Sequence, residues 1–168
     1  WAERLMGRDV DEATGQIEFE GRTVSVGTHP LGIDVSEQER LANLAAPAVP
    51  GRPTEILGVD RLDYTKGILE RMRAIERLLE IHPGYRHRVV FTQIAVPSRE
   101  RVTEYRQLKR EIDEIVGRIN GRFSDRGWTP IRYMTRALSA RELAGLYRQG
   151  DEALITPVLE AMNLVPKR

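Results

Sequence analysis

The stretch EILGVDRLDYTKGILERMRAIERLLEIHPG, residues 55–84, decides the fold. It opens with a short apolar run, EILGV, that has the length of a buried strand. Apolar residues then recur at helical spacing until Pro83-Gly84 stop the pattern. They are Ile68, Met72, Ile75, Leu78, Leu79 and Ile81. The stretch therefore predicts a strand, a loop and a helix over 68–81.

The same alternation repeats toward the C-terminus. RVVFTQIAV (88–96), IRYM (131–134) and EALIT (152–156) predict three further strands, the first almost wholly apolar, as in a strand covered on both faces. An apolar stripe from Val102 to about Gly121 and a shorter one over 140–147 predict the helices between them. Strand and helix in strict alternation predict an α/β fold, a Rossmann-like parallel sheet with helices on both faces.

The N-terminal part has a different pattern. GQIEFEGRTVSV (15–26) alternates apolar and polar residues around Glu20-Gly21-Arg22, which predicts a hairpin. Ser36 with Glu39 has capping-box spacing and predicts a helix to about Leu44. The proline-rich AAPAVPGRP that follows resembles a linker. We therefore expect two parts: 1–50, a hairpin and connecting segment, and 51–168, a domain built on the parallel sheet.

Composition narrows the classes of function. The chain has 168 residues and a net charge of +1, so no overall field draws it to nucleic acid or to an anionic membrane. The charged residues of the long helix mix both signs and predict a solvated face with ion pairs. There is no cysteine, and the three histidines lack the spacing of a metal site. No run could span a membrane and no signal peptide is recognisable, so we expect a cytoplasmic protein.

Chemistry is expected at the carboxyl ends of the strands, where open parallel sheets bind ligands. After EILGV, Arg61 and Lys66 lie close to the start of the next helix, an arrangement suited to a diphosphate. The alternative is that the two cations only pair with Asp60 and Asp63.

Two further loops carry candidate residues. Arg99 follows the second strand and could bind another anion, although single loop arginines are commonly just solvated. Glu160 follows the last strand and could hold a polyol, or could simply lie near a helix dipole. No catalytic triad, Walker loop or metal-ligand motif occurs.

The chain resembles the trehalose-6-phosphate synthase family, retaining glycosyltransferases that move glucose from UDP-glucose to glucose 6-phosphate. The resemblance is colinear over roughly residues 15–165. Its motifs are PLGID, GVDRLDYTKG, FTQIAVPSR, GRINGRF, GWTPIRYM, LYRQGDEALITP and MNLV. It implies the C-terminal domain of a glycosyltransferase-B fold, truncated, with a missing N-terminal domain that supplies most acceptor contacts. Residues 1–50 would then come from the end of that N-terminal domain, and 51–168 would form a partial Rossmann-like nucleotide-sugar-binding domain.

The resemblance also implies roles for individual residues. Arg61 and Lys66 would bind the donor diphosphate and stabilise the departing UDP, Arg99 would contact the phosphate of glucose 6-phosphate, and Leu138 would approach the uracil ring. The last loop would enclose the donor glucose and ribose through Glu160, Ala161, Met162, Asn163, Leu164 and Val165. The resemblance further implies that no metal, other cofactor or protein nucleophile takes part. The departing phosphate would take the acceptor proton, and Arg61 and Lys66 would stabilise the growing negative charge.

The last loop departs from the family pattern. Leu159-Glu160-Ala161 stand where the family has Arg-Asp-Gly, and Pro166-Lys167-Arg168 where it has Ala-Lys-Glu. A carboxylate displaced by one methylene can lower a rate on the order of a hundredfold. Two alternatives stay open: a non-catalytic regulatory or assembly module, and a related glucosyltransferase such as glucosylglycerol-phosphate synthase. A homo-oligomer is also open.

Overall fold

The computed structural model describes residues 14–19, 21–25, 27, 32–98 and 103–158. The chain divides into two compact units, residues 1–32 and 33–168, and each is described by itself.

The smaller unit contains the predicted hairpin. Strands β1 (Gln16–Phe19) and β2 (Arg22–Ser25) pair antiparallel, with Ile17 opposite Val24. Gly21 adopts a positive φ of 73° at the turn, a conformation that glycine accepts without steric cost. The hairpin is thus confirmed.

The larger unit is built on a four-stranded parallel sheet in the order β5-β4-β3-β6. Its strands are β3 (Thr54–Arg61), β4 (Val89–Val96), β5 (Ile131–Met134) and β6 (Glu152–Ala153). Central β4 is buried along nearly its whole length, because it has a neighbour on each side and cover on both faces. The parallel sheet is therefore confirmed.

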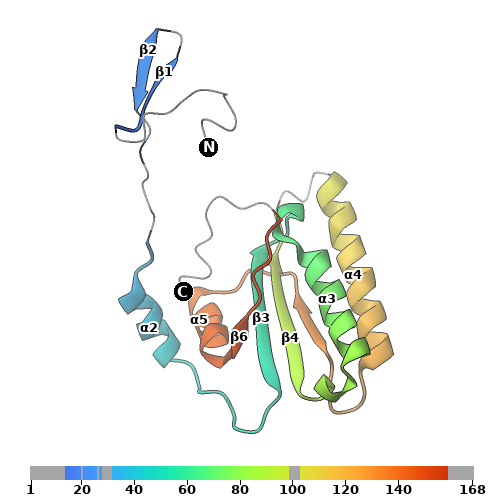
Figure 1. Ribbon diagram of the computed structural model, residues 1–168. Coiled ribbons are helices and arrows are strands. Elements are labelled where there is room, and N and C mark those ends of the chain that lie inside the picture. Colours follow the sequence, from blue (N-terminus) through green and yellow to red (C-terminus); the bar gives the residue numbers. More distant parts are fainter. Residues whose placement is uncertain (1–13, 20, 26, 28–31, 99–102, 159–168) are drawn as a thin grey trace. The chain divides into compact units, whose positions relative to one another are not determined.

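Helices connect the strands as the alternation predicts. They are α3 (Ile68–Ile81), α4 (Thr103–Phe123) and α5 (Ala140–Gln149), with the short turns η1 (Tyr64–Lys66) and η2 (Pro83–Tyr85) beside α3. Helices α3 and α4 pack against each other and run along the sheet, while α5 lies apart from them near β6 (Figure 1).

Neighbouring residues of β3 show that both faces are covered. A Cβ on Gly58 would meet Arg71 of α3, whereas a Cβ on Gly150, at the end of α5, would meet Leu57. Because successive side chains of a strand point to opposite faces, α3 and α5 cover opposite faces of the sheet. This agrees with the reversal of strand order, since a right-handed crossover toward β6 must use the other face.

The hydrophobic core lies between the sheet and the pair α3 and α4. Its fully enclosed members come from α3, α4 and β4 and include Met72, Leu79, Phe91, Ile112 and Ile119. Trp128 closes one end by donating its indole N–H to the Val89 carbonyl at 2.8 Å. The exposed face of α4 carries an ion pair of Lys109 with Asp113, as predicted, and Arg118 of α4 pairs with Glu76 of α3.

The larger unit begins earlier than the predicted boundary near residue 50. Helix α2 (Val35–Asn43) packs on α5, and Arg148 of α5 donates to the Asn43 side chain at 2.6 Å. The segment before the proline-rich stretch therefore belongs with the sheet.

The predicted capping residues of α2 are wrong by one half-turn. Asp34, not Ser36, caps the helix and accepts from the Glu37 backbone N–H at 2.9 Å. Both residues are good N-caps, and the earlier one adds two residues to the helix. A full capping box forms instead at α5, between Ser139 and Glu142.

The last predicted strand is also shorter than expected. Strand β6 pairs with β3 only at Glu152 and Ala153, and Leu154 makes a final backbone hydrogen bond to Leu57 at 2.8 Å. Beyond it, Thr156 turns to a side-chain partner on α3, Arg71. No helix within the described ranges is long and apolar enough to cross a bilayer.

Gly58 tests the packing between β3 and α3. We expect Gly58→Ala to lower the free energy of unfolding by about 1–3 kcal/mol, because its Cβ would overlap the Gln93 side-chain oxygen and lie 2.8 Å from Arg71 Nη1. The control is Gly117→Ala in α4, where a Cβ meets nothing within 4 Å and helix propensity favours alanine by about 0.5–1 kcal/mol. Urea unfolding measures both; equal effects of the two substitutions would contradict the predicted overlap.

Candidate functional site

The candidate site lies where the strand order reverses. Strands β4 and β5 follow one another on one side of β3, whereas β6, the last strand in the chain, lies on the other side of β3. Such a reversal leaves a crevice beyond the carboxyl ends of the two diverging strands, the usual ligand position in open α/β sheets. The loops after β3 and β6 flank this crevice.

The loop after β3 is shaped by Asp63. Its carboxylate accepts the Thr65 backbone N–H at 3.0 Å and the Thr65 hydroxyl at 2.8 Å, and its carbonyl accepts the Lys66 N–H at 3.1 Å. An acidic side chain that accepts from the residue two positions on is a common turn former. Gly67 then leaves η1 with a left-handed φ of 65° and starts α3.

Tyr105 of α4 supports the same carboxylate by donating its hydroxyl to the second Asp63 oxygen at 3.2 Å. Desolvation is the largest single influence on Asp63 and would raise its pKa. The Thr65 and Tyr105 hydrogen bonds and the charge of Arg61 together outweigh it and lower the pKa. Asp63 is therefore held as an anion.

The two predicted cations lie at opposite ends of this loop. Arg61 is the last residue of β3 and is exposed, while Lys66 is the last residue of η1 and is half-buried. Asp60, one of the two acids suggested as their surface partners, is instead turned inward. Its side chain is only 5% exposed and lies 2.5 Å from Arg71.

Arg71 is a buried arginine on the inner face of α3. Its side chain is 1% exposed, and besides Asp60 it donates to the Gln93 side chain at 3.0 Å, the Lys66 carbonyl at 2.6 Å and the Thr156 hydroxyl at 2.9 Å. These partners belong to β4 and to both loops that flank the crevice, so one guanidinium joins them. A planar group with five N–H donors suits this task.

Two backbone contacts bring the same loops together. The Val158 N–H donates to the Thr65 carbonyl at 2.8 Å. A Cβ on Gly67 would overlap the Thr156 carbonyl oxygen, so this close approach requires glycine in addition to the positive φ. The segment after β6 is therefore fastened to the loop that carries Lys66.

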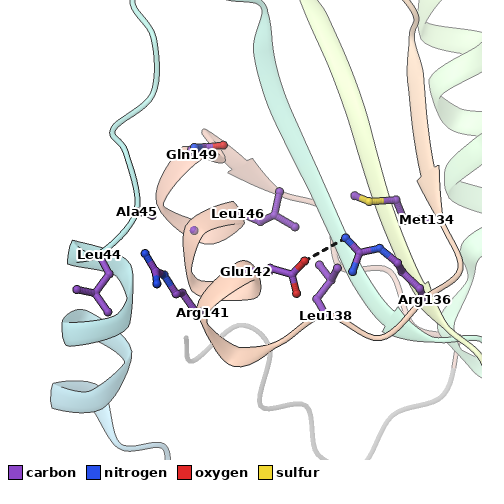
Figure 2. Close-up of a pocket in the computed structure, with 10 residues that line it drawn as sticks. Leu44, Ala45, Met134, Arg136, Leu138, Arg141, Glu142, Leu146 and Gln149 are labelled. Atoms are coloured by element: carbon purple, nitrogen blue, oxygen red, sulfur yellow. Dashed lines mark hydrogen bonds and ion pairs between the residues drawn. The ribbon is translucent and has the colours of Figure 1, made fainter.

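Leu138 lines a separate hollow of about 400 Å³ on the α5 side of the sheet (Figure 2). Apolar side chains from β5 and α5, including Met134 and Leu146, form part of its wall, and Arg136 and Glu142 add charge. The hollow could hold a flat, partly apolar group with polar edges.

Glu142 is firmly anionic at this hollow. The backbone N–H and hydroxyl of Ser139, followed by Arg136, hydrogen bond to its carboxylate and lower its pKa to about 2. The ion pair with Arg136 measures 3.1 Å and is drawn as a dashed line in Figure 2.

Seven predicted site residues lie outside the described residues. They are Arg99, Glu160, Ala161, Met162, Asn163, Leu164 and Val165. Of the others, Arg61 and Lys66 share one loop and Leu138 belongs to the hollow on the other side of the sheet. Within the described ranges, no group of three or more acidic or histidine side chains could hold a metal ion.

The whole chain, residues 1–168, matches the profile of glycosyltransferase family 20. The chain belongs to this family. Alpha,alpha-trehalose-phosphate synthase [UDP-forming] A from Dictyostelium discoideum is 40% identical over 96% of the chain. The chain spans 23% of that relative's length.

Solved structures agree with the family 20 assignment. An alpha,alpha-trehalose-phosphate synthase (UDP-forming) from Burkholderia xenovorans, in complex with glucose-6-phosphate, is 38% identical and superposes with a TM-score of 0.84 over 90% of this chain and 35% of that one. A structure described as trehalose-6-phosphate from E. coli bound with UDP-2-fluoro glucose gives a TM-score of 0.85 at 32% identity, over 95% and 37% of the two chains. The predicted family and glycosyltransferase-B type fold are thus confirmed.

Sequence reasoning missed Arg71, although a signal was present. Arg71 falls three residues after Ile68 and four before Ile75, on the stripe that faces the sheet. A charged residue on an apolar stripe must find partners, because an unpaired buried charge is prohibitively costly. Asp60 and Gln93, on the facing strands, were the acceptors to look for.

Asp63 gives the site a measurable pH dependence. A carboxyl whose pKa is lowered by folding contributes stability above its unfolded pKa of about 3.9 and loses it as the pH falls through the folded value. We therefore expect the difference in unfolding free energy between the wild type and Asp63→Asn to shrink from pH 6 to pH 3, in urea unfolding at each pH.

The control for that series is Asp113→Asn, an exposed acid on α4. A difference between the wild type and Asp63→Asn that stays constant over the whole pH range would show that folding does not lower this pKa.

Proposed function

We propose that this chain carries the donor half of a retaining glucosyltransferase, which transfers glucose from UDP-glucose to glucose 6-phosphate and releases trehalose 6-phosphate and UDP. The observation that carries the proposal is the loop with Arg61 and Lys66 at the crevice where the strand order reverses. The family 20 match supports it, as do relatives described as UDP-forming and as complexes with glucose-6-phosphate or a UDP-glucose analogue.

Arg61 and Lys66 would bind the two phosphates of the donor. An arginine offers paired N–H donors to phosphate oxygens, and a lysine acts as a compact positive charge. The loop also leads into α3, a helix of 14 residues whose N-terminal end favours anions. Both cations would stabilise charge best when it grows on the departing diphosphate.

The transfer itself needs no protein nucleophile in this proposal. The bond between the sugar C1 and the diphosphate oxygen breaks, and a bond from C1 to the acceptor hydroxyl oxygen forms on the same face. The departing phosphate takes the hydroxyl proton, so the products are a glycoside and UDP. Arg61 and Lys66 act by holding this phosphate and offsetting its charge. We expect UDP binding by this chain to need no metal ion, and binding that a chelator abolishes would contradict this expectation.

The hollow beside Leu138 is proposed for the uracil ring. Leu138, Met134 and Leu146 supply apolar wall, and polar side chains line its edge. In the same proposal, Arg99 binds the acceptor phosphate and residues 160–165 bind the donor glucose and ribose, as the resemblance implies.

The cytoplasmic location, the absence of nucleic-acid partners and a homo-oligomer stay predictions.

A non-catalytic module of the same fold is the second candidate. The substitution of Glu160-Ala161 for the family's Asp-Gly favours it. A methylene added to a carboxylate that hydrogen bonds sugar hydroxyls, and a Cβ where the family has none, both weaken a fitted sugar site. Donor binding by this chain separates the two candidates.

The deciding experiment is calorimetric titration of the chain with UDP and UDP-glucose. We expect saturable binding that Arg61→Ala and Lys66→Ala each weaken about 10- to 100-fold, because each removes a charged hydrogen-bond donor. The matched control is Arg73→Ala, which removes an exposed arginine that pairs with Glu70 of the same helix and should leave the affinity unchanged.

A chain that is folded by circular dichroism and binds neither nucleotide would remove the donor proposal and favour the non-catalytic module. Equal losses in Arg61→Ala and Arg73→Ala would instead indicate nonspecific attraction between charges.

A further inference from the structure

We propose that Arg71 is a positioning residue for donor binding: it holds the loop of Lys66 and the segment of Thr156 in one fixed arrangement across the crevice. This proposal rests on the proposed function, because it assigns the purpose of the arrangement to the donor. Arg71 itself is 1% exposed and is not placed in contact with the donor.

The argument starts from the cost of burying this charge. An isolated guanidinium in the interior is strongly unfavourable unless an opposite charge and hydrogen-bond acceptors surround it. Asp60 supplies the charge at 2.5 Å, and Gln93 donates its amide N–H to the same carboxylate oxygen at 3.2 Å. The pair is thereby anchored on β3 and β4, the two central strands of the sheet.

The remaining donors of Arg71 point away from the sheet to the two loops. Nη2 donates to the Lys66 carbonyl at 2.6 Å and Nε to the Thr156 hydroxyl at 2.9 Å. Both nitrogens belong to one planar group, so the separation of their two acceptors is fixed by the geometry of the guanidinium. A movement of Thr156 is therefore transmitted to Lys66.

A role in core stability alone would require acceptors for Nη2 and Nε, because Asp60 and Gln93 both engage Nη1. It would not require that these acceptors belong to two different loops. The acceptors are the carbonyl of Lys66, a residue proposed to bind the diphosphate, and the hydroxyl of Thr156, three residues beyond β6. Preorganised contacts of this kind raise affinity because the ordering is complete before the ligand arrives.

Thr156→Val is the most informative variant, because it keeps the shape of the side chain and removes one hydrogen bond. The matched control is Thr92→Val, which also removes one threonine hydrogen bond, that to Glu55, on the opposite face of the sheet. Thr92 is itself fully buried, so the control is expected to cost at least as much stability.

The first readout is hydrogen exchange in the chain without nucleotide. We expect Thr156→Val to speed exchange of the Lys66 and Val158 amides about tenfold, and Thr92→Val to leave both unchanged. Unchanged exchange at Lys66 in Thr156→Val would overturn the proposal, because the two loops would then move independently.

The second readout is UDP affinity by calorimetry, in the wild type and in Lys66→Ala. If Thr156 acts through Lys66, Thr156→Val lowers affinity about three- to tenfold in the wild type and has no effect in Lys66→Ala. The same loss in both backgrounds would overturn the positioning role. Arg71→Lys keeps the charge but not the planar fork, and should lower UDP affinity at least as much as Thr156→Val.

The two proposals fail separately. A wild-type chain that binds no UDP contradicts the proposed function, and the exchange comparison, which uses no nucleotide, still decides whether Arg71 couples the loops. A wild-type chain that binds UDP, with Lys66 exchange unaffected by Thr156→Val, contradicts only the positioning role.

Discussion

The buried pair of Arg71 and Asp60 is the interaction on which the carboxyl edge of the sheet depends. Two charges removed from water gain stability only when every donor and acceptor is satisfied, and here Gln93, Thr156 and the Lys66 carbonyl complete the set. An apolar pair of similar volume could stabilise the core equally well. It could not fix a backbone carbonyl in one loop and a hydroxyl in another.

The strand order explains why such a connection is needed. Where the strand order reverses between β3 and β6, no crossover helix joins the ends of the two strands. The loops beyond them are held together by direct contacts, namely the Val158–Thr65 hydrogen bond, the close approach of Gly67 to Thr156, and Arg71. Helix α3 starts directly after the first of these loops, so a side chain one turn into the helix can reach both. Two glycines leave space for this arrangement. Gly58 lies against the Arg71 guanidinium, and Gly67 lies against the Thr156 carbonyl.

Periodicity predicted most of the fold, because elements with one strong hydrophobic pattern have one way to bury it. The helix over 68–81 and the strand over 131–134 have the predicted bounds for this reason. The exact ends of elements were harder to predict where two local signals are equivalent. Asp34 and Ser36 can both cap α2, and the sequence does not show which one does. The strand expected over EALIT is shortened because Thr156 accepts a hydrogen bond from Arg71 instead of continuing the sheet. The loop with Arg61 and Lys66 was predictable from charge and position, whereas Arg71 was hidden in an apolar stripe.

The same pairing decides what charge the crevice presents. Sequence order suggests that Asp60 and Asp63 cancel Arg61 and Lys66, since the four lie within one loop. Asp60 instead forms a buried ion pair with Arg71. The Asp63 carboxylate accepts hydrogen bonds from Thr65 and Tyr105, and the charge of Arg61 also acts on it. Among these five ionised residues the cations outnumber the acids by one. The proposed diphosphate site needs this excess, and the buried arginine supplies it without contacting the proposed donor.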